Sequence, residues 1–262
     1  MSDNEVRYEI DGAVATITLN RPAARNALTA DMKNWLLGAL RKSSSDRAVR
    51  AVILTGAGQA FCAGQDLREH AELLKAGGSP LDTVREQYNP IVTSIVTMPK
   101  PVIAALPGVA AGAGAALAFA CDFRIATRRA SLVMAFSRVG LSADSGASWT
   151  LQRLVGTARA AELLMLAEPI TAEQALAMGL LTRLVDEDEL ADQVRDFAAQ
   201  LAAGPTAAYG AIKESLLFAA GHGLVAALGK EAEIQLRLGE TDDHKSATAA
   251  FVNKEQPTYR GS

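Results

Sequence analysis

The sequence has few cysteine, histidine and aromatic residues, and neither sign of charge is in large excess. Its two cysteines, Cys62 and Cys121, are too few for a disulfide framework. Its three histidines, His70, His222 and His244, lie far apart and match no spacing of metal ligands. The composition therefore argues against a disulfide-stabilised scaffold, and we expect no metal site.

The charge balance argues against two kinds of partner. A net charge of −3 over 262 residues provides no broad basic field for nucleic acid or anionic lipid. The first residues, MSDNEVRYEI, contain neither the basic nor the apolar region of a secretory signal. We expect a cytoplasmic protein that binds neither nucleic acid nor a membrane.

One apolar segment, residues 101–123, is about as long as a bilayer core is thick. It reads PVIAALPGVAAGAGAALAFACDF, so Pro101 and Pro107 divide it and small alanine and glycine side chains dominate it. Asp122 and Arg124 close it. These features favour a buried strand, a tight loop and a buried helix over a membrane span.

Hydrophobic residues make up 49% of the chain, enough for one large α/β domain or a domain with an appendage. Alternating patterns at 6–10 and 14–19 flank Asp11-Gly12, a dipeptide favoured in two-residue turns. The chain is therefore predicted to begin with a β-hairpin. Thr29 precedes apolar residues at helical spacing, and we expect it to cap a helix.

Further along, strands and helices are mixed. Two buried strands, VRAVILTG and PVIAAL, are predicted on either side of a polar segment whose residues 68–90 have the position of a lid. DFRIAT and SLVMAF are typical of short strands, and SWTLQRLVG begins a long helix. From Thr171 onward the pattern is mainly helical, so a helical region is predicted to follow a mixed α/β part.

Two glycine-rich loops each follow a buried strand: GAGQAFCAGQDL at 56–67 and GVAAGAGAAL at 108–117. Free N–H groups at a helix start, with no side chains in the way, can hold a negative oxygen. If both loops point at one spot, two N–H groups could hold a thioester oxygen and the enolate formed from it. Each loop alone is also explained as a turn or a tight packing contact. Neither completes a dinucleotide-binding G-x-G-x-x-G at a strand–helix junction.

Several motifs together resemble the enoyl-CoA hydratase/isomerase (crotonase) superfamily. They are FCAGQDL, PVIAALPGVAAGAGAALAFACDFRIAT, GLSADSGASWTLQRLVG and ITAEQALAMGLLTRLV, in the family's order. The resemblance implies an α/β fold, a crotonase-like spiral of ββα units. It implies a core with the CoA site at 1–195 and a C-terminal helical trimerisation region at 196–262. The expected assembly is a homotrimer or a homohexamer made of two trimers.

The resemblance also implies site residues. Ala63 and Ala113 match the two oxyanion-hole donors, with Ala113 where most of the family has glycine. The matched acyl-CoA positions are Arg25, Ala63, Gly64, Gln65, Asp66, Leu67, Gly112, Gly114, Phe136, Phe251 and Lys254. Arg25 would lie near the CoA phosphates, and Phe251 and Lys254 would reach a neighbouring subunit's CoA. The alternatives are a solvated arginine, a core phenylalanine and a surface lysine.

Two acids of the family are missing. Hydration of an enoyl-CoA in the family uses two glutamates to hold a water and exchange its protons. Their positions are taken by Ala116 and Phe136. Neither a methyl nor a phenyl group moves a proton, so we do not expect the ordinary hydratase mechanism.

Asp144 is the remaining candidate acid/base. AFSRVGLSADSGASW resembles the branch of Δ3,Δ2-enoyl-CoA isomerases and the 1,2-epoxyphenylacetyl-CoA isomerases of phenylacetate breakdown, in which the matching aspartate acts alone. Here Ala143 and Ala147 replace a proline and a glycine of that pattern. The alternative is that Asp144 caps the helix beginning near Ser148 or shapes the turn at Gly146.

The sequence therefore predicts an acyl-CoA isomerase in which Ala63 and Ala113 hold a thioester enolate and Asp144 shuttles a proton. No separate cofactor is expected, because CoA arrives as part of the substrate. One alternative is a hydratase-like enzyme with acids from the lid, where Glu69, His70 and Glu72 lie. The other is a non-catalytic acyl-CoA-binding subunit.

Overall fold

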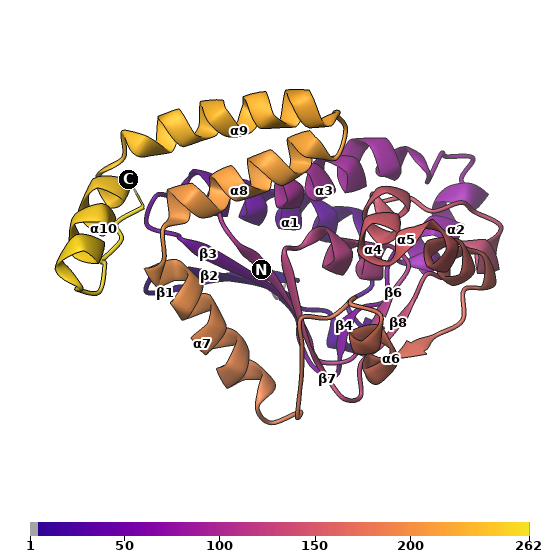
Figure 1. Ribbon diagram of the computed structural model, residues 1–262. Helices are drawn as coiled ribbons and strands as arrows, with labels where there is room; N and C mark the ends of the chain where they lie inside the picture. The colour runs from indigo at the N-terminus through magenta and orange to yellow at the C-terminus, as the bar shows by residue number, and fades with distance from the viewer. Residues whose placement is uncertain (1–4, 262) are drawn as a thin grey trace.

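Two β-sheets form the core of the computed structural model, which describes residues 5–261 (Figure 1). The six-stranded sheet has the order β1 (Val6–Asp11), β2 (Val14–Leu19), β3 (Ala51–Gly56), β5 (Val102–Leu106), β7 (Phe123–Thr127) and β10 (Arg183–Val185). The four-stranded sheet has the order β4 (Ala60–Cys62), β6 (Val109–Ala111), β8 (Ser131–Val133) and β9 (Ile170–Thr171). Neighbours are parallel except for the β1–β2 and β8–β9 pairs.

Successive strands alternate between the two sheets. β3, β5 and β7 enter the six-stranded sheet, and β4, β6 and β8, which follow them directly, enter the four-stranded one. Each pair is followed by helix: α2 (Leu67–Lys75) and α3 (Asn89–Val96) after β4, α4 (Ala113–Ala120) after β6, and α5 (Ala147–Leu166) after β8. This repeat confirms the predicted spiral of ββα units.

The beginning of the chain follows the local sequence signals. β1 and β2 pair with Asp11 opposite Val14, so a two-residue turn joins them, and Gly12 has the positive φ of +55° that such a turn needs. Helix α1 (Ala30–Ser45) begins where the Thr29 hydroxyl accepts a hydrogen bond of 3.2 Å from the Met32 N–H. The predicted hairpin and helix cap are both confirmed, although the two turn residues are Gly12 and Ala13, one position after the predicted Asp11-Gly12.

The central strands of the six-stranded sheet are buried on both faces, whereas the edge strand β1 is mostly exposed. In β3, Val52 and Leu54 join the large apolar core with α1, α3 and α4, whereas Ile53 packs with α7 (Leu190–Ala203). A strand covered on both faces needs apolar residues at every position, which explains the unbroken run in VRAVILTG.

The C-terminal region begins later than expected. The 195/196 boundary falls inside α7, which continues to Ala203 and packs its whole apolar face on the sheet. The break lies instead at Gly204-Pro205, before α8 (Thr206–Ala219). Helices α9 (Leu224–Gly239) and α10 (Asp242–Asn253) complete this region, and Figure 1 shows α8 and α9 next to each other.

The apolar segment 101–123 is divided among β5, β6 and α4 rather than forming one helix. Helix α6 (Ala172–Ala177) lies between β9 and β10. Among residues 5–261, no helix has both the length and the apolarity to cross a bilayer.

Glycine at position 114 should be required for packing. A Cβ placed there would lie 2.3 Å from the carbonyl oxygen of Cys62, so α4 or β4 must shift. We expect Gly114→Ala to lower the free energy of unfolding by about 1–3 kcal/mol, measured by urea denaturation. Gly38→Ala is the matched control, because a Cβ there meets nothing within 4 Å, and it should be neutral or stabilising. Equal stability of the two variants would contradict this packing.

Candidate active site

The two glycine-rich loops touch at the carboxyl ends of β4 and β6. Gly64 has a φ of +89°, and a Cβ there would lie 2.8 Å from the carbonyl oxygen of Ala111 and 3.4 Å from the nitrogen of Ala113. Gly112, with a φ of +51°, turns the chain into α4. The absence of a side chain at Gly64 thus lets one loop lie against the first turn of the helix that follows the other.

Two backbone N–H groups at this contact are free. In the loop after β4, Leu28 donates to the Gly64 carbonyl at 2.7 Å and accepts from Asp66 at 3.0 Å, so the amide of Gln65 faces the other way. Ala113 is the first residue of α4, so the Ala113 N–H has no hydrogen-bond partner within the helix. Within the described part of the chain, neither the Gln65 N–H nor the Ala113 N–H has a hydrogen-bond acceptor.

The loop after β4 presents a different donor from the predicted one. The Ala63 N–H donates to the carbonyl oxygen of Arg25 at 2.9 Å, so it is not available to a ligand. The prediction of Ala63 as a donor is therefore wrong, and Gln65, two residues further on, has the free amide. At the second loop the predicted residue does have the free N–H. Ala113 is not among the residues with positive φ, so its methyl group is accommodated without strain.

Gln65 and Ala113, the residues with the free amides, both line one pocket of about 130 Å³. Its lining residues are Ala63, Gly64, Gln65, Leu67, His70, Pro80, Leu81, Thr83, Val84, Tyr88, Gly112, Ala113, Ala135, Phe136, Val139, Leu141 and Asp144. The walls are mostly apolar, and Asp144 is the one carboxylate among these described residues. A largely apolar cavity with a few convergent polar groups is typical of a small-molecule site.

Asp144 does not cap α5. The residue at the cap position is Gly146, and no side chain bonds to the helix start there. The Asp144 backbone carbonyl accepts from the Ala147 N–H at 2.9 Å, while its carboxylate accepts from the Ser145 hydroxyl at 2.7 Å. Burial raises the pKa of Asp144 above its usual value, and the Ser145 hydroxyl and the Lys33 charge only partly offset this. The carboxylate is thus free to face a ligand and is a better proton acceptor than an exposed one.

The two residues at the positions of the family's glutamates differ in whether they line the pocket. Ala116 is fully buried within α4 and is not among the lining residues. Phe136 is also buried, but its side chain contributes to the pocket wall. Neither position supplies a proton-transfer group.

The acids of the lid point elsewhere. Both carboxylate oxygens of Glu69 accept from the Ala30 N–H, at 3.1 and 3.2 Å, at the start of α1. Glu72 is exposed and does not line the pocket. His70 does line it. Of the three lid residues, only the imidazole faces the cavity.

Asp66 has a structural role. Its carboxylate accepts from the Arg68 N–H at 2.9 Å and the Glu69 N–H at 3.3 Å, which caps α2, and it pairs with Arg21 at 2.9 Å. Burial raises its pKa, but these hydrogen bonds and the Arg21 charge outweigh burial, so the pKa lies below the usual value. Neither Asp66 nor Gly114, the packing glycine of α4, is a lining residue.

The other expected acyl-CoA positions are exposed. Leu67 begins α2 and lines the pocket. Arg25 is exposed, has a left-handed φ of +50°, and its guanidinium forms no ion pair with residues 5–261. Phe251 and Lys254 lie on and just after α10, which Figure 1 places at the opposite end of the molecule from α2. Within one chain they do not line this pocket.

Sequence reasoning did not select Lys33. Its side chain is 1% exposed, and its ammonium donates to the Gln65 side-chain oxygen at 3.0 Å and the Thr83 hydroxyl at 2.5 Å. A signal was present, because position 33 falls on the same helical stripe as Leu36 and Leu40, which are buried in the core. Elsewhere in residues 5–261, no group of three His, Cys, Asp or Glu side chains is arranged to hold a metal ion.

Comparisons with known proteins agree with this fold. Residues 9–262 match the enoyl-CoA hydratase/isomerase family. A Rhodobacter capsulatus protein named as an enoyl-CoA hydratase is 43% identical over 262 residues, all of both chains. The 1,2-epoxyphenylacetyl-CoA isomerase of Escherichia coli is 40% identical over 255 residues, 96% of this chain and 97% of that one.

The likeness extends to solved structures. A crystal structure from Mycobacterium abscessus, named as an enoyl-CoA hydratase/isomerase, superposes with a TM-score of 0.93 at 43% identity, covering 98% of this chain and 100% of that one. The interleaved sheets are thus those of the crotonase fold. The chain belongs to the enoyl-CoA hydratase/isomerase family.

The two thiols should be unreactive in the folded protein. Burial raises the pKa of Cys62 and of Cys121 to about 12, so almost no thiolate is present at pH 8. We expect no reaction with a thiol-specific disulfide reagent at pH 8 in buffer, and two thiols per chain in denaturant. Reaction of either thiol in the native protein at the rate of free cysteine would contradict the burial of these residues.

Proposed function

We propose that the chain is an acyl-CoA isomerase that moves a double bond through a thioester enolate. One observation carries the proposal: a single carboxylate, Asp144, shares an apolar pocket with the free N–H groups of Gln65 and Ala113. Two convergent amide donors suit an oxygen that gains negative charge, and one carboxylate suits a proton that leaves and returns.

The proposed reaction starts from a 3-enoyl thioester. Asp144 takes a proton from the carbon next to the thioester carbonyl, and the electron pair of that C–H bond delocalises onto the carbonyl oxygen. The Gln65 and Ala113 N–H groups hold the resulting dienolate, and losing one such donor typically costs ~3 kcal/mol in the barrier. Asp144 then returns the proton at the far end of the dienolate, which gives the 2-enoyl thioester. The step is redox-neutral, so no separate cofactor is needed.

The acid content of the pocket favours isomerisation over hydration. Adding water across a double bond uses two positioned acid/base groups, and the family's two positions are Ala116 and Phe136 in this chain. The acids of the lid do not replace them, because the Glu69 carboxylate is occupied at the start of α1 and Glu72 is exposed outside the pocket; of the three lid residues only His70 lines it. The Escherichia coli relative named as a 1,2-epoxyphenylacetyl-CoA isomerase supports the same choice, although another relative of similar identity carries a hydratase name. Arg25, which has no ion pair within the described residues, would meet the CoA phosphates.

Replacing Asp144 should remove the chemistry and leave binding. Asp144→Asn keeps the size of the side chain but accepts no proton, so 3-enoyl-CoA isomerisation should fall by at least about 1,000-fold. Exchange of the α-proton with solvent deuterium should stop as well, while the dissociation constant for a 2-enoyl-CoA changes little. Absorbance of the conjugated thioester and mass spectrometry in D₂O measure these effects.

Asp188→Asn is the matched control, because Asp188 is exposed and lies outside the pocket. It should behave as the unchanged protein. Near-normal turnover of Asp144→Asn would overturn the assignment. Water addition to a 2-enoyl-CoA by the unchanged protein would favour the hydratase alternative, and tight binding without exchange would favour a non-catalytic subunit.

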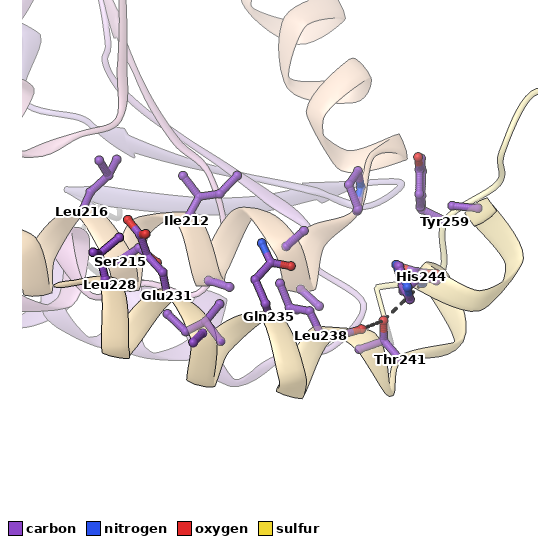
Figure 2. Close-up of a pocket in the computed structure, with 18 residues that line it drawn as sticks. Ile212, Ser215, Leu216, Leu228, Glu231, Gln235, Leu238, Thr241, His244 and Tyr259 are labelled. Atoms are coloured by element: carbon purple, nitrogen blue, oxygen red, sulfur yellow. Dashed lines mark hydrogen bonds between the residues drawn. The ribbon is translucent and has the colours of Figure 1, made fainter. Parts of the chain in front are cut away.

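We also propose that the chain assembles as a homotrimer or as a hexamer of two trimers. Large apolar side chains are exposed on the C-terminal helices: Ile212, Leu216, Leu217, Leu224, Val225, Leu228, Leu236, Phe251 and Val252. Figure 2 shows the groove of about 710 Å³ that α8, α9 and α10 form, with Ile212 and Leu216 along α8 and Leu228 along α9. Several large apolar side chains exposed on one set of helices are typical of a protein interface. In an assembly, Phe251 and Lys254 would be free to reach a neighbouring chain's CoA.

A charge on this surface should weaken the assembly. The Leu236 side chain is 77% exposed, so Leu236→Glu should leave the fold intact and shift the sedimentation coefficient to that of a smaller species. Leu74→Glu, on exposed α2, is the matched control and should not change the assembly. Sedimentation of the unchanged protein as a monomer at micromolar concentration would contradict the proposed oligomer.

A further inference from the structure

Lys33 is a buried cation behind the pocket wall. It does not line the pocket, yet it contacts three residues that do. Its ammonium donates to the Gln65 side-chain oxygen at 3.0 Å and to the Thr83 hydroxyl at 2.5 Å, and it lies 4.9 Å from the centre of the Tyr88 ring. An ammonium group 1% exposed is costly to bury unless other groups replace its hydration, and these three contacts do so only in part.

The same contacts hold Gln65 from two sides. The Gln65 side-chain oxygen accepts from Lys33 and, at 2.7 Å, from the Tyr88 hydroxyl. These two bonds fix the Gln65 side chain, while the Leu28 contacts with Gly64 and Asp66 hold the backbone on either side; together they restrict the peptide whose N–H is one of the two free amides of the pocket. Lys33 therefore acts on the oxyanion donor without touching the cavity.

The charge of Lys33 also reaches the carboxylates around it. Asp144, before α5, and Glu69, on α2, are the two anionic groups whose fields act on Lys33. The Glu69 carboxylate is already bound at the start of α1. Asp144 has only the hydroxyl of Ser145 as a hydrogen-bond partner within the described residues, and the Lys33 charge also acts to lower its pKa.

We propose that Lys33 is a positioning residue for the isomerisation: it orients the Gln65 amide and supplies a fixed counter-charge for the reacting pair. This inference rests on the proposed function. In the resting enzyme the negative charge is on Asp144, and after proton removal it is on the thioester oxygen beside the Gln65 N–H. A cation that is hydrogen-bonded to the Gln65 side chain, and whose charge also acts on Asp144, favours negative charge in this region and needs no reorganisation during the reaction.

The titratable groups near Lys33 and Asp144 determine which ionisation a pH profile of the activity would report. Glu69 and His70 come from α2, Tyr88 from the segment before α3, and Asp144 from the loop before α5. Burial raises the pKa of Tyr88 well above its usual value, so its hydroxyl stays protonated. Burial lowers the pKa of Lys33, and the charges of Glu69 and Asp144 act against that effect. The acidic limb of the profile should therefore belong to Asp144.

Lys33→Met tests both roles at once. It removes the hydrogen bonds and the charge but keeps an unbranched side chain that can stay buried. We expect kcat for a 3-enoyl-CoA to fall by about 10- to 100-fold with little change in KM, because the oxyanion donor is no longer aligned. The acidic limb of kcat/KM should move to higher pH by about one unit, since the cation that favours ionised Asp144 is gone.

Lys33→Gln separates the two roles and serves if the methionine variant folds poorly. Its amide can still donate to Gln65 but has no charge. The kcat of Lys33→Gln should therefore be higher than that of Lys33→Met, while the acidic limb of kcat/KM stays at the higher pH. Lys33→Arg keeps the charge and should restore the position of the limb. Lys42→Met is the control on the same helix, because Lys42 is exposed and lies over the Tyr8 ring, and it should change neither quantity. A kcat within twofold of normal and an unmoved limb in both Lys33→Met and Lys33→Gln would overturn the proposal.

A second measurement does not depend on turnover. The Asp144 carboxyl carbon, labelled with ¹³C and identified by its loss in Asp144→Asn, should titrate at higher pH in Lys33→Met than in the unchanged protein. An identical titration would overturn the counter-charge role even if the chain proves not to be an isomerase. Failure of the unchanged protein to exchange the α-proton would instead count against the proposed function. The comparison of Asp144 titrations in Lys33→Met and the unchanged protein would still test the counter-charge role.

Discussion

The close approach of two loops is the constraint on which the site depends. Gly64 lies against the first turn of α4, and Gly114 lies against the carbonyl of Cys62, at distances that leave no room for a side chain. This contact brings an amide from each loop, those of Gln65 and Ala113, into one cavity. Because the donors are main-chain groups, the side chains at these positions are free to vary, which explains how alanine can occupy position 113.

The pocket combines these donors with one weakly compensated carboxylate. Asp144 is partly buried among apolar side chains, and only Ser145 donates to it within the described residues. Burial without a close ion pair makes a carboxyl group a stronger proton acceptor, which a single-base isomerisation needs. The charge of Lys33, which does not itself line the pocket, partly offsets the rise in the Asp144 pKa. The site is therefore balanced between desolvation, which raises the basicity of Asp144, and a buried cation, which keeps it ionised.

Several features could be predicted because they depend on neighbours in the sequence. The first hairpin and the cap at Thr29 are local, and both were confirmed, with the hairpin turn at Gly12-Ala13. Strands β4 and β6 could not be found in this way, because each has three residues and no periodicity. The boundary at 195/196 was misplaced because α7 is amphipathic along its full length, and only its packing on the sheet shows that it belongs to the core.

The sequence by itself determined the family and, through that resemblance, the expected ββα repeat, because motif order is visible along the chain. It also singled out Asp144 as a candidate, because the family's two glutamates are missing. Only the tertiary structure decided which amide is free. The Ala63 N–H is taken by Arg25, a residue 38 positions earlier, and that contact leaves the neighbouring Gln65 N–H to the pocket. The role of Lys33 likewise depends on residues from three separate segments. Such contacts follow from how distant segments pack, and no local pattern encodes them.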